Sequence, residues 1–359
     1  MRLLITALLA AGLAAAQPKV ETGEINGAAF RIEVPEAWNG VLIMYCHGYS
    51  PAPQKFDAAK AEPIAQLLGA KGYAVAQSGY VAGGWAVEEA VQDTQALLRY
   101  FRNKYGAPKE TYVTGHSMGG FLTMVLVESF PDVYNGGLAL CGPLAPAAWF
   151  MRHNVFDMRV VFDYYFPGAL PPPDNVPDSY TMTPALNAST QALLDGKPDA
   201  AAALRRFTGI RTNKELAATL VFFTYILKDL RQRGGGNPFD NRSIIYEGTG
   251  EDDAVNDGVK RYAADPRAAE YVRTWYTPSG RLTRPLLAIH TTYDPLVPPA
   301  VPDQYQTITE LAGGSGWFVQ QYVKSAGHCA ISPAQMVGGL GQVRDWNLKH
   351  TRPAGGASR

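Results

Sequence analysis

Short apolar runs alternate with longer amphipathic stretches through the first 143 residues, and this alternation constrains the fold more than any other feature. The apolar runs are rich in β-branched and aromatic residues, as strands are, and the stretches between them have the length of helices. Regular alternation of this kind predicts a mostly parallel sheet with helices on both faces. The run Val41–Cys46 is hydrophobic at every position, which is typical of a central strand buried on both sides.

Residues 144–281 interrupt the alternation, which resumes after them. The interruption contains clustered aromatic residues and helical stretches but no convincing parallel strand. We therefore predict an α/β core formed by 17–143 and 282–359, with 144–281 as a largely helical cap and a frayed tail at 351–359. The expected strands are 29–34, 41–46, 73–77, 111–114, 137–141, 286–290 and 317–323. The expected helices are 57–69, 87–104, 118–130, 200–207, 214–231, 302–311 and 333–348.

The N-terminal residues predict export. Arg2 precedes an apolar run over 3–13, and small residues at 14–16 allow cleavage before Gln17. This pattern is typical of a secretory signal peptide over residues 1–16, although an N-terminal core helix is the alternative. No later stretch has the roughly 20 apolar residues of a membrane span. The expected location is secreted or periplasmic.

Charge and cysteine content exclude several classes of protein. The chain has 32 basic and 32 acidic residues, so nothing in the net charge indicates binding to nucleic acid or to anionic membranes. Three cysteines allow one disulfide and leave at least one thiol over, and the sequence does not say which two pair. No Cys/His spacing suits zinc, and we expect neither a metal nor a cofactor. The oligomeric state stays open.

The segment Gly115-His116-Ser117-Met118-Gly119 matches the pattern G-x-S-x-G. It follows a predicted strand and begins an apolar helix, which is the context of a nucleophile elbow. A sharp strand-to-helix turn exposes the serine hydroxyl and points helix N–H groups at developing negative charge. We therefore predict that Ser117 is the nucleophile, although a glycine-rich turn with an incidental serine would have the same pattern.

A serine hydroxyl needs a base, and the base needs an orienting carboxylate. Of the six histidines, His328 lies in a loop of small residues after the predicted strand 317–323. Asp294 follows the strand 286–290 and precedes a stiff Pro-Leu-Val-Pro turn. Parallel strands bring their carboxyl ends to one sheet edge, so we predict a triad of Ser117, His328 and Asp294.

The oxyanion of the tetrahedral intermediate needs hydrogen-bond donors. The residue after the nucleophile supplies one backbone N–H in such elbows, which here is Met118. The loop after the central strand supplies the other, and we expect it from Tyr49, with Gly48 as the alternative.

These motifs together resemble the α/β-hydrolase fold over roughly residues 25–143 and 282–350. The pairing of His47-Gly48-Tyr49 with Gly-His-Ser-Met-Gly-Gly is similar to secreted esterases of the cutinase and polyester-hydrolase kind. The resemblance implies oxyanion donation from the Tyr49 and Met118 amides. Those esterases lack a large cap, so residues 144–281 depart from their pattern. The segment 34–40 resembles a group of exported bacterial hydrolases, which implies the same fold.

The predicted function is hydrolysis of a small-molecule carboxylic ester, with Trp85, Trp149 and Phe150 lining an apolar substrate site beneath the cap. The aromatic residues of the cap could instead form its own small core. An exported aminopeptidase is the first rival, and it would need carboxylates aimed at a substrate amine. A non-catalytic binding protein is the second rival, but no triad residue is missing. The cap carboxylates considered for an amine are Asp157, Asp163 and Glu215.

Overall fold

The computed structural model describes residues 18–357, so the predicted signal peptide over residues 1–16 lies outside the described part of the chain. None of the helices within residues 18–357 is both long enough and apolar enough to cross a bilayer.

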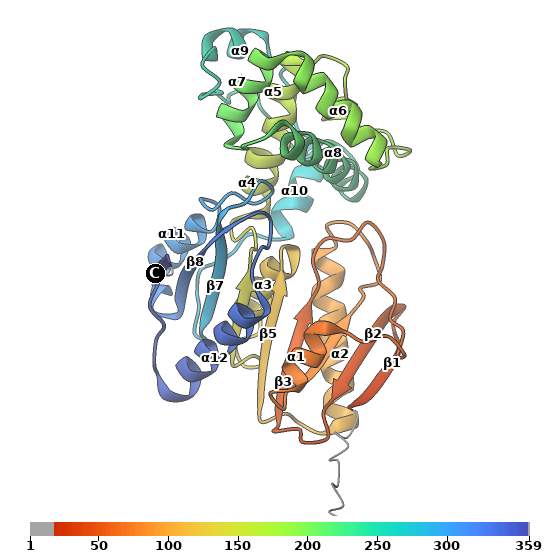
Figure 1. The fold of residues 1–359 in the computed structure, drawn as a ribbon, viewed down its shortest axis with the longest axis vertical. Helices are drawn as coiled ribbons and strands as arrows, with labels where there is room; N and C mark the ends of the chain where they lie inside the picture. The colour runs from red at the N-terminus through yellow and green to blue at the C-terminus, as the bar shows by residue number, and fades with distance from the viewer. Residues whose placement is uncertain (1–17, 358–359) are drawn as a thin grey trace, which may run out of the picture.

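A sheet of nine strands forms the centre of the described chain (Figure 1). Its strands are β1 (Lys19–Ile25), β2 (Ala28–Val34), β3 (Val41–Cys46), β4 (Ala74–Ser78), β5 (Glu110–His116), β6 (Gly136–Leu140), β7 (Leu286–Tyr293), β8 (Phe318–Ala326) and β9 (Gly356–Ala357). They lie in the order β1-β2-β4-β3-β5-β6-β7-β8-β9. The β1–β2 and β2–β4 pairs are antiparallel, and the other neighbours are parallel. The sheet is therefore mostly parallel, as predicted.

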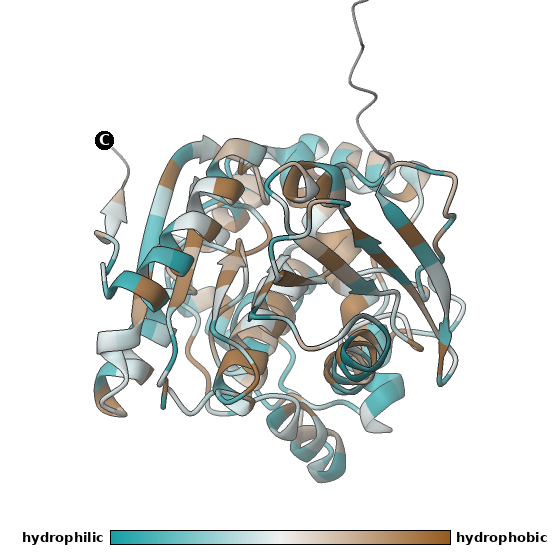
Figure 2. Cartoon of the chain, turned by 90° about the horizontal axis from the view of Figure 1, so that it is seen from below, coloured by the Kyte–Doolittle hydropathy of each residue, from teal (hydrophilic) through white to brown (hydrophobic). Residues whose placement is uncertain are grey.

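Helices cover both faces of this sheet. Helices α1 and α12 pack with one face, and α2, α3 and α11 pack with the other. Figure 2 shows apolar residues on the central strands and a larger share of polar residues on outlying helices. Strands β4 and β6 are buried at every residue, as strands covered on both faces must be. The bounds are α1 (Pro63–Gly69), α2 (Val87–Tyr105), α3 (Met118–Ser129), α11 (Asp303–Leu311) and α12 (Pro333–Lys349).

A group of helices is inserted between β6 and β7, at the end of the sheet where β5 meets α3 (Figure 1). We refer to it as the cap. Its α4, η1 and α5 follow one another directly, with η1 a π-helical stretch. The elements are α4 (Ala147–Phe150), η1 (Met151–Phe156), α5 (Asp157–Tyr165), α6 (Pro184–Gly196), α7 (Pro198–Thr208), α8 (Asn213–Gly234), α9 (Asp252–Gly258) and α10 (Pro266–Thr274).

Helix α8 is anchored to the core through ion pairs near its C-terminus. Asp229 accepts a hydrogen bond of 2.6 Å from the backbone N–H of Trp85. Arg233 forms a salt bridge of 2.9 Å with Glu89 of α2, pairs with Asp229 on its own helix and donates to the carbonyl oxygen of Gly83. These groups are largely buried, so the contacts fix α8 against the loop before α2.

Each strand and helix predicted from the sequence is present, and the main differences concern β1, the start of α1 and the C-terminal tail. Strand β1 was not predicted because only Val20 and Ile25 of its seven residues are apolar, as its place at an exposed sheet edge allows. The helix expected from residue 57 begins at Pro63, because the Asp57 carboxylate accepts from the Ala59 amide and forms a turn. The tail expected to fray instead pairs with β8 through β9.

A disulfide joins Cys141, directly after β6, to Cys329, which follows the predicted base His328. The two cysteines lie 188 residues apart in sequence, and the whole cap lies between them. Cys46 is the remaining cysteine, a free and buried thiol at the end of β3. The structure therefore decides which cysteines pair, a question that the sequence left open. The two that pair, Cys141 and Cys329, lie in loops that meet at the sheet edge beside Ser117.

We expect the double variant Cys141→Ser/Cys329→Ser to have a free energy of unfolding lower by about 2–4 kcal/mol, because the crosslink limits the freedom of the unfolded chain. Urea unfolding followed by circular dichroism measures this difference. Wild type treated with a reductant should approach the midpoint of the variant. Equal midpoints for oxidised wild type and the variant would contradict the expectation.

Candidate active site

Ser117 lies at the tight turn between β5 and α3, with a positive φ of 58°. Such a backbone angle is rare for a residue with a side chain and occurs where the surrounding structure enforces it. The flanking glycines explain how the turn fits. A Cβ atom on Gly115 or Gly119 would collide with the carbonyl oxygen of Cys46 on β3. The elbow therefore sits directly against the central strand, and its serine faces the sheet edge.

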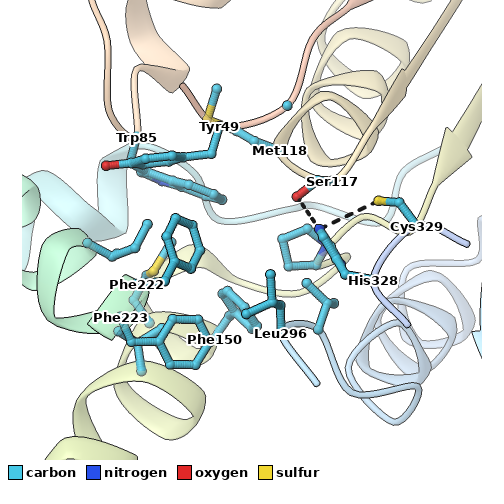
Figure 3. Close-up of a pocket in the computed structure, with 16 residues that line it drawn as sticks. Tyr49, Trp85, Ser117, Met118, Phe150, Phe222, Phe223, Leu296, His328 and Cys329 are labelled. Atoms are coloured by element: carbon cyan, nitrogen blue, oxygen red, sulfur yellow. Dashed lines mark hydrogen bonds between the residues drawn. The ribbon is translucent and has the colours of Figure 1, made fainter. Parts of the chain in front are cut away.

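Ser117, His328 and Asp294 form one chain of hydrogen bonds. Ser117 Oγ lies 2.8 Å from His328 Nε2 and can donate its proton there (Figure 3). On the other side of the ring, His328 Nδ1 lies 2.7 Å from Asp294 Oδ2 and donates to it. The serine comes from the β5–α3 turn, the aspartate from the loop after β7 and the histidine from the loop after β8. The structure thus brings together all three residues that the sequence predicted.

The Asp294 carboxylate is held in one orientation and kept ionised. Its Oδ1 accepts from the amides of Leu296 and Val297, at 2.9 and 3.0 Å, which leaves Oδ2 for the histidine. Burial by itself raises the pKa of Asp294. The hydrogen bond and charge of His328, with the Val297 amide, outweigh burial and lower that pKa below its usual value. A negative carboxylate beside the ring stabilises the imidazolium that forms when Ser117 gives up its proton.

A second histidine approaches the same carboxylate, and the sequence analysis did not identify it. His290 Nε2 lies 3.6 Å from Asp294 Oδ2 and donates to the carbonyl oxygen of Val297 at 2.8 Å. Burial lowers the pKa of His290, which favours its neutral form. His290 therefore supports the turn that holds Asp294. Its place in the buried strand β7, four residues before the aspartate, is the sequence signal that could have identified it.

The residues predicted to supply the oxyanion donors both line the cavity that contains Ser117. Met118 is the first residue of α3, where a backbone N–H has no acceptor within the helix. Among the hydrogen bonds of residues 18–357, none is donated by the amide of Met118 or of Tyr49. Both amides are thus free to bind a substrate oxygen, and their role as the oxyanion hole stays a prediction.

Ser117 and His328 open into an apolar cavity of about 290 Å³ between the core and the cap (Figure 3). The core contributes Trp85 and Tyr49 to the lining. The Tyr49 ring packs edge-on against Phe222 of α8, with 5.2 Å between the ring centroids. Both Trp85 and Phe150, predicted as substrate-binding residues, lie in its wall. Sequence reasoning missed the contribution of α8, because a helix of this composition is equally suited to the core of a cap. The cap residues that line the cavity are Phe150, Met151, Val155, Phe222, Phe223 and Ile226.

Trp149 does not line this cavity, which corrects its predicted role there. Neighbouring residues of an α-helix point about 100° apart, so Phe150 and Trp149 of α4 face different sides. The Trp149 ring stacks on the His153 ring, with 5.0 Å between the ring centroids, and Trp149 lines a neighbouring cavity.

The cap carboxylates considered for binding an amine all have other partners. Asp157 pairs with Arg152 at 2.9 Å, and Asp163 pairs with Arg159 at 2.7 Å. Glu215 caps the start of α8. None of the three lines the cavity at Ser117. Within residues 18–357 no group of three or more His, Cys, Asp or Glu side chains is arranged to hold a metal ion.

The mostly parallel sheet, the elbow after β5, the acid after β7 and the histidine after β8 define the α/β-hydrolase fold. Residues 43–210, just under half of the chain, match the model of a hydrolase family described as serine aminopeptidase, S33.

A curated relative and several solved structures are also similar to the chain. The o-phthalyl amidase of Xanthobacter agilis is 30% identical over 124 residues, which cover 33% of this chain and 26% of that enzyme. The chain thus matches about a quarter of the length of this relative. An acylaminoacyl peptidase of Pyrococcus horikoshii shares 13% identity at a TM-score of 0.49, over 93% of this chain and 42% of that one. An esterase of Pyrococcus furiosus shares 12% identity at a TM-score of 0.48, over 91% of this chain and 89% of that one.

We expect Asp294→Asn to fold but to lose activity by about 10³–10⁴-fold in kcat. The two amides that bond Oδ1 would hold the asparagine carbonyl oxygen, so its NH₂ group would face His328. The histidine would then carry its proton on Nε2 and could not accept one from Ser117. Steady-state kinetics with a chromogenic ester measures the loss.

Asp303→Asn is a matched control for this variant, because Asp303 bonds the Tyr322 hydroxyl away from the triad. Its activity should stay near that of wild type, and both variants should melt near the wild-type temperature. An Asp294→Asn enzyme within tenfold of wild type would contradict the assigned role.

Proposed function

We propose that the protein is a serine hydrolase that cleaves carboxylic esters through an acyl-enzyme. The observation that carries this proposal is the chain of hydrogen bonds from Ser117 through His328 to Asp294, which opens into an apolar cavity. A serine hydroxyl becomes a good nucleophile when a base is within hydrogen-bond reach and a third group orients that base.

The reaction proceeds in two halves. Ser117 Oγ attacks the acyl carbon while His328 Nε2 takes the hydroxyl proton. The carbonyl oxygen becomes an oxyanion, held by the amides of Tyr49 and Met118. The bond between carbon and the leaving oxygen then breaks as His328 returns the proton to that oxygen. Water attacks the acyl-enzyme while His328 takes one of its protons. The bond between the acyl carbon and Ser117 Oγ then breaks as His328 gives that proton to Oγ, which releases the acid and restores the serine.

The cavity lining favours an uncharged, apolar acyl group. Among the described residues that line it there is no Asp, Glu, Lys or Arg, and His328 is the one titratable group besides the Tyr49 hydroxyl. Apolar surface buried there is worth roughly 25 cal/mol per Å². A charged acyl group would lose its hydration without gaining a partner.

The same feature argues against an aminopeptidase that binds a free amine, although the matched family model carries that description. An ammonium group needs a carboxylate, and among the described residues none lines the cavity at Ser117, while Asp157, Asp163 and Glu215 of the cap are engaged elsewhere. Hydrolysis of amides is the second candidate function. It is favoured by the local similarity to o-phthalyl amidase over 124 residues.

We also propose that the protein acts outside the cytoplasm. The disulfide between Cys141 and Cys329 supports this location, because such bonds form and persist in oxidising compartments. It is independent support for the signal peptide predicted from residues 1–16.

Ser117→Ala should abolish hydrolysis while leaving the fold intact, because alanine fits the elbow without a clash. We expect kcat on 4-nitrophenyl butyrate to fall by about 10⁵–10⁶-fold. Wild type should also be labelled covalently by a fluorophosphonate, and the variant should not. Wild type that cleaves butyryl anilide but no ester would favour the amidase. Wild type that cleaves neither, and takes up no label, would favour the non-catalytic rival.

Phe150→Ala should reduce the preference for bulky acyl groups, because Phe150 lines the acyl cavity. Loss of one ring contact is worth about 1–3 kcal/mol, or roughly tenfold or more in kcat/KM. The ratio of kcat/KM for 4-nitrophenyl benzoate over the acetate measures this preference. Tyr164→Ala, a cap residue outside the cavity, is the matched control and should leave the ratio unchanged. Equal losses on both esters in Phe150→Ala would indicate a stability effect instead.

A further inference from the structure

A second cavity, of about 420 Å³, lies between the cap and the loop that follows Asp294. One wall comes from the cap, where Trp149 and Met158 are joined by Phe207 from the end of α7. The other wall comes from the core loop and includes Leu296 and Val301. Nothing in the triad chemistry or in the acyl cavity uses this space.

The second cavity adjoins the site at Ser117. Phe223 and Leu296 line both cavities, so the two cavities adjoin one another at these side chains. Leu296 also donates its amide to Asp294, the carboxylate that holds His328. Figure 3 shows Leu296 in the view between Phe150 and His328. At Leu296 the second cavity therefore adjoins the part of the site that contains Asp294 and His328.

The histidine side is where the leaving group must lie. In ester cleavage the leaving oxygen receives its proton from the same Nε2 that took the serine proton. That oxygen must be within hydrogen-bond reach of His328, while the acyl group occupies the cavity lined by Phe150. An alcohol portion attached to that oxygen is directed past Leu296 toward the second cavity.

The lining of the second cavity is suited to an aromatic group. The stacked pair of Trp149 and His153 has ring planes 21° apart, and Phe207 and Met158 add an aromatic ring and a thioether. Burial and the nearby Arg152 lower the pKa of His153, which favours an uncharged ring.

Charge at the second cavity narrows the ligand further. Glu247 is the one Asp or Glu among its described lining residues, and it is exposed. No Lys or Arg of the described chain lines the cavity. A flat neutral ring fits this surface, whereas an anionic group would find no cation there.

We propose that the second cavity binds the leaving group of the substrate, and that this group is a neutral aromatic alcohol. The proposal rests on the ester hydrolysis proposed above and assigns its substrate class: an apolar acyl group joined to an aryl or arylalkyl alcohol. Trp149 then contributes to substrate selection after all, on the leaving-group side instead of the acyl side.

A pair of acetate esters tests the proposal, since both have the same small acyl group. The measured quantity is the ratio of kcat/KM for 1-naphthyl acetate over ethyl acetate. Trp149→Ala should lower this ratio about tenfold, the effect of losing one ring contact. Trp149→Phe should keep most of the ratio, because a ring remains to stack. Phe150→Ala is the matched control, and it should lower the benzoate-to-acetate ratio but leave the naphthyl-to-ethyl ratio within about twofold.

Binding of 1-naphthol, measured by calorimetry, tests the cavity without turnover. Wild type and Phe150→Ala should bind it alike, and Trp149→Ala should bind it about tenfold more weakly. Equal losses on the naphthyl and ethyl esters, or a naphthol Kd that responds to Phe150→Ala and not to Trp149→Ala, would overturn the proposal. If wild type hydrolyses no ester, the proposed function fails, whereas naphthol binding still decides whether the cavity takes an aromatic ring. Melting temperatures exclude unfolding as the cause.

Discussion

The close approach of the elbow to β3 is the contact on which the active site depends. Gly115 of β5 pairs in register with Cys46 of β3, and Gly119 in the first turn of α3 approaches the Cys46 carbonyl oxygen as well. Two positions without a Cβ atom therefore let a helix start directly over the edge of a buried strand. That start leaves Ser117 in its strained conformation and leaves the first N–H groups of α3 without intrahelical acceptors. Both the backbone conformation of Ser117 and the unpaired N–H groups are thus maintained by the packing of the elbow against the sheet.

The other two triad residues are held by contacts of the same local kind. Asp294 is oriented by two backbone amides of its own loop, and His290 supports that loop from the strand below it. His328 is tied to the sheet through its neighbour Cys329, whose disulfide partner lies at the end of β6. Asp294 is thus positioned by residues within a few places of it, whereas Ser117 and His328 depend on contacts with β3 and with the end of β6. The sheet then brings the three loops to one edge, and the site has little need of the cap for its geometry.

Much of this arrangement could be predicted from sequence because it depends on short-range patterns. Strands buried on both faces are apolar throughout, and the elbow needs its glycines at fixed offsets from Ser117. Strand β1 escaped prediction because an exposed edge strand carries no such pattern. The sequence also did not predict which side of α4 faces Ser117, because Trp149 and Phe150 are both aromatic and either could line the cavity. Which of them lies in which cavity depends on how the cap is seated, and its anchor pairs residues about 144 positions apart.

The position of that anchor on α8 has a consequence for how related enzymes can diverge. The cavity wall and the anchor share one face of α8. The wall residues Phe222 and Ile226 are followed by the anchor residues Asp229 and Arg233 at intervals of four, three and four residues, which places all four on the same side of the helix. Inserting or deleting one residue between them would rotate one set away from the core by about 100°. Substitutions at the wall residues can therefore change which substrates fit the cavity, while the length of α8 stays constant. Among homologues, gaps in an alignment should fall in the loops on either side of α8, and variation within it should concentrate at the wall positions.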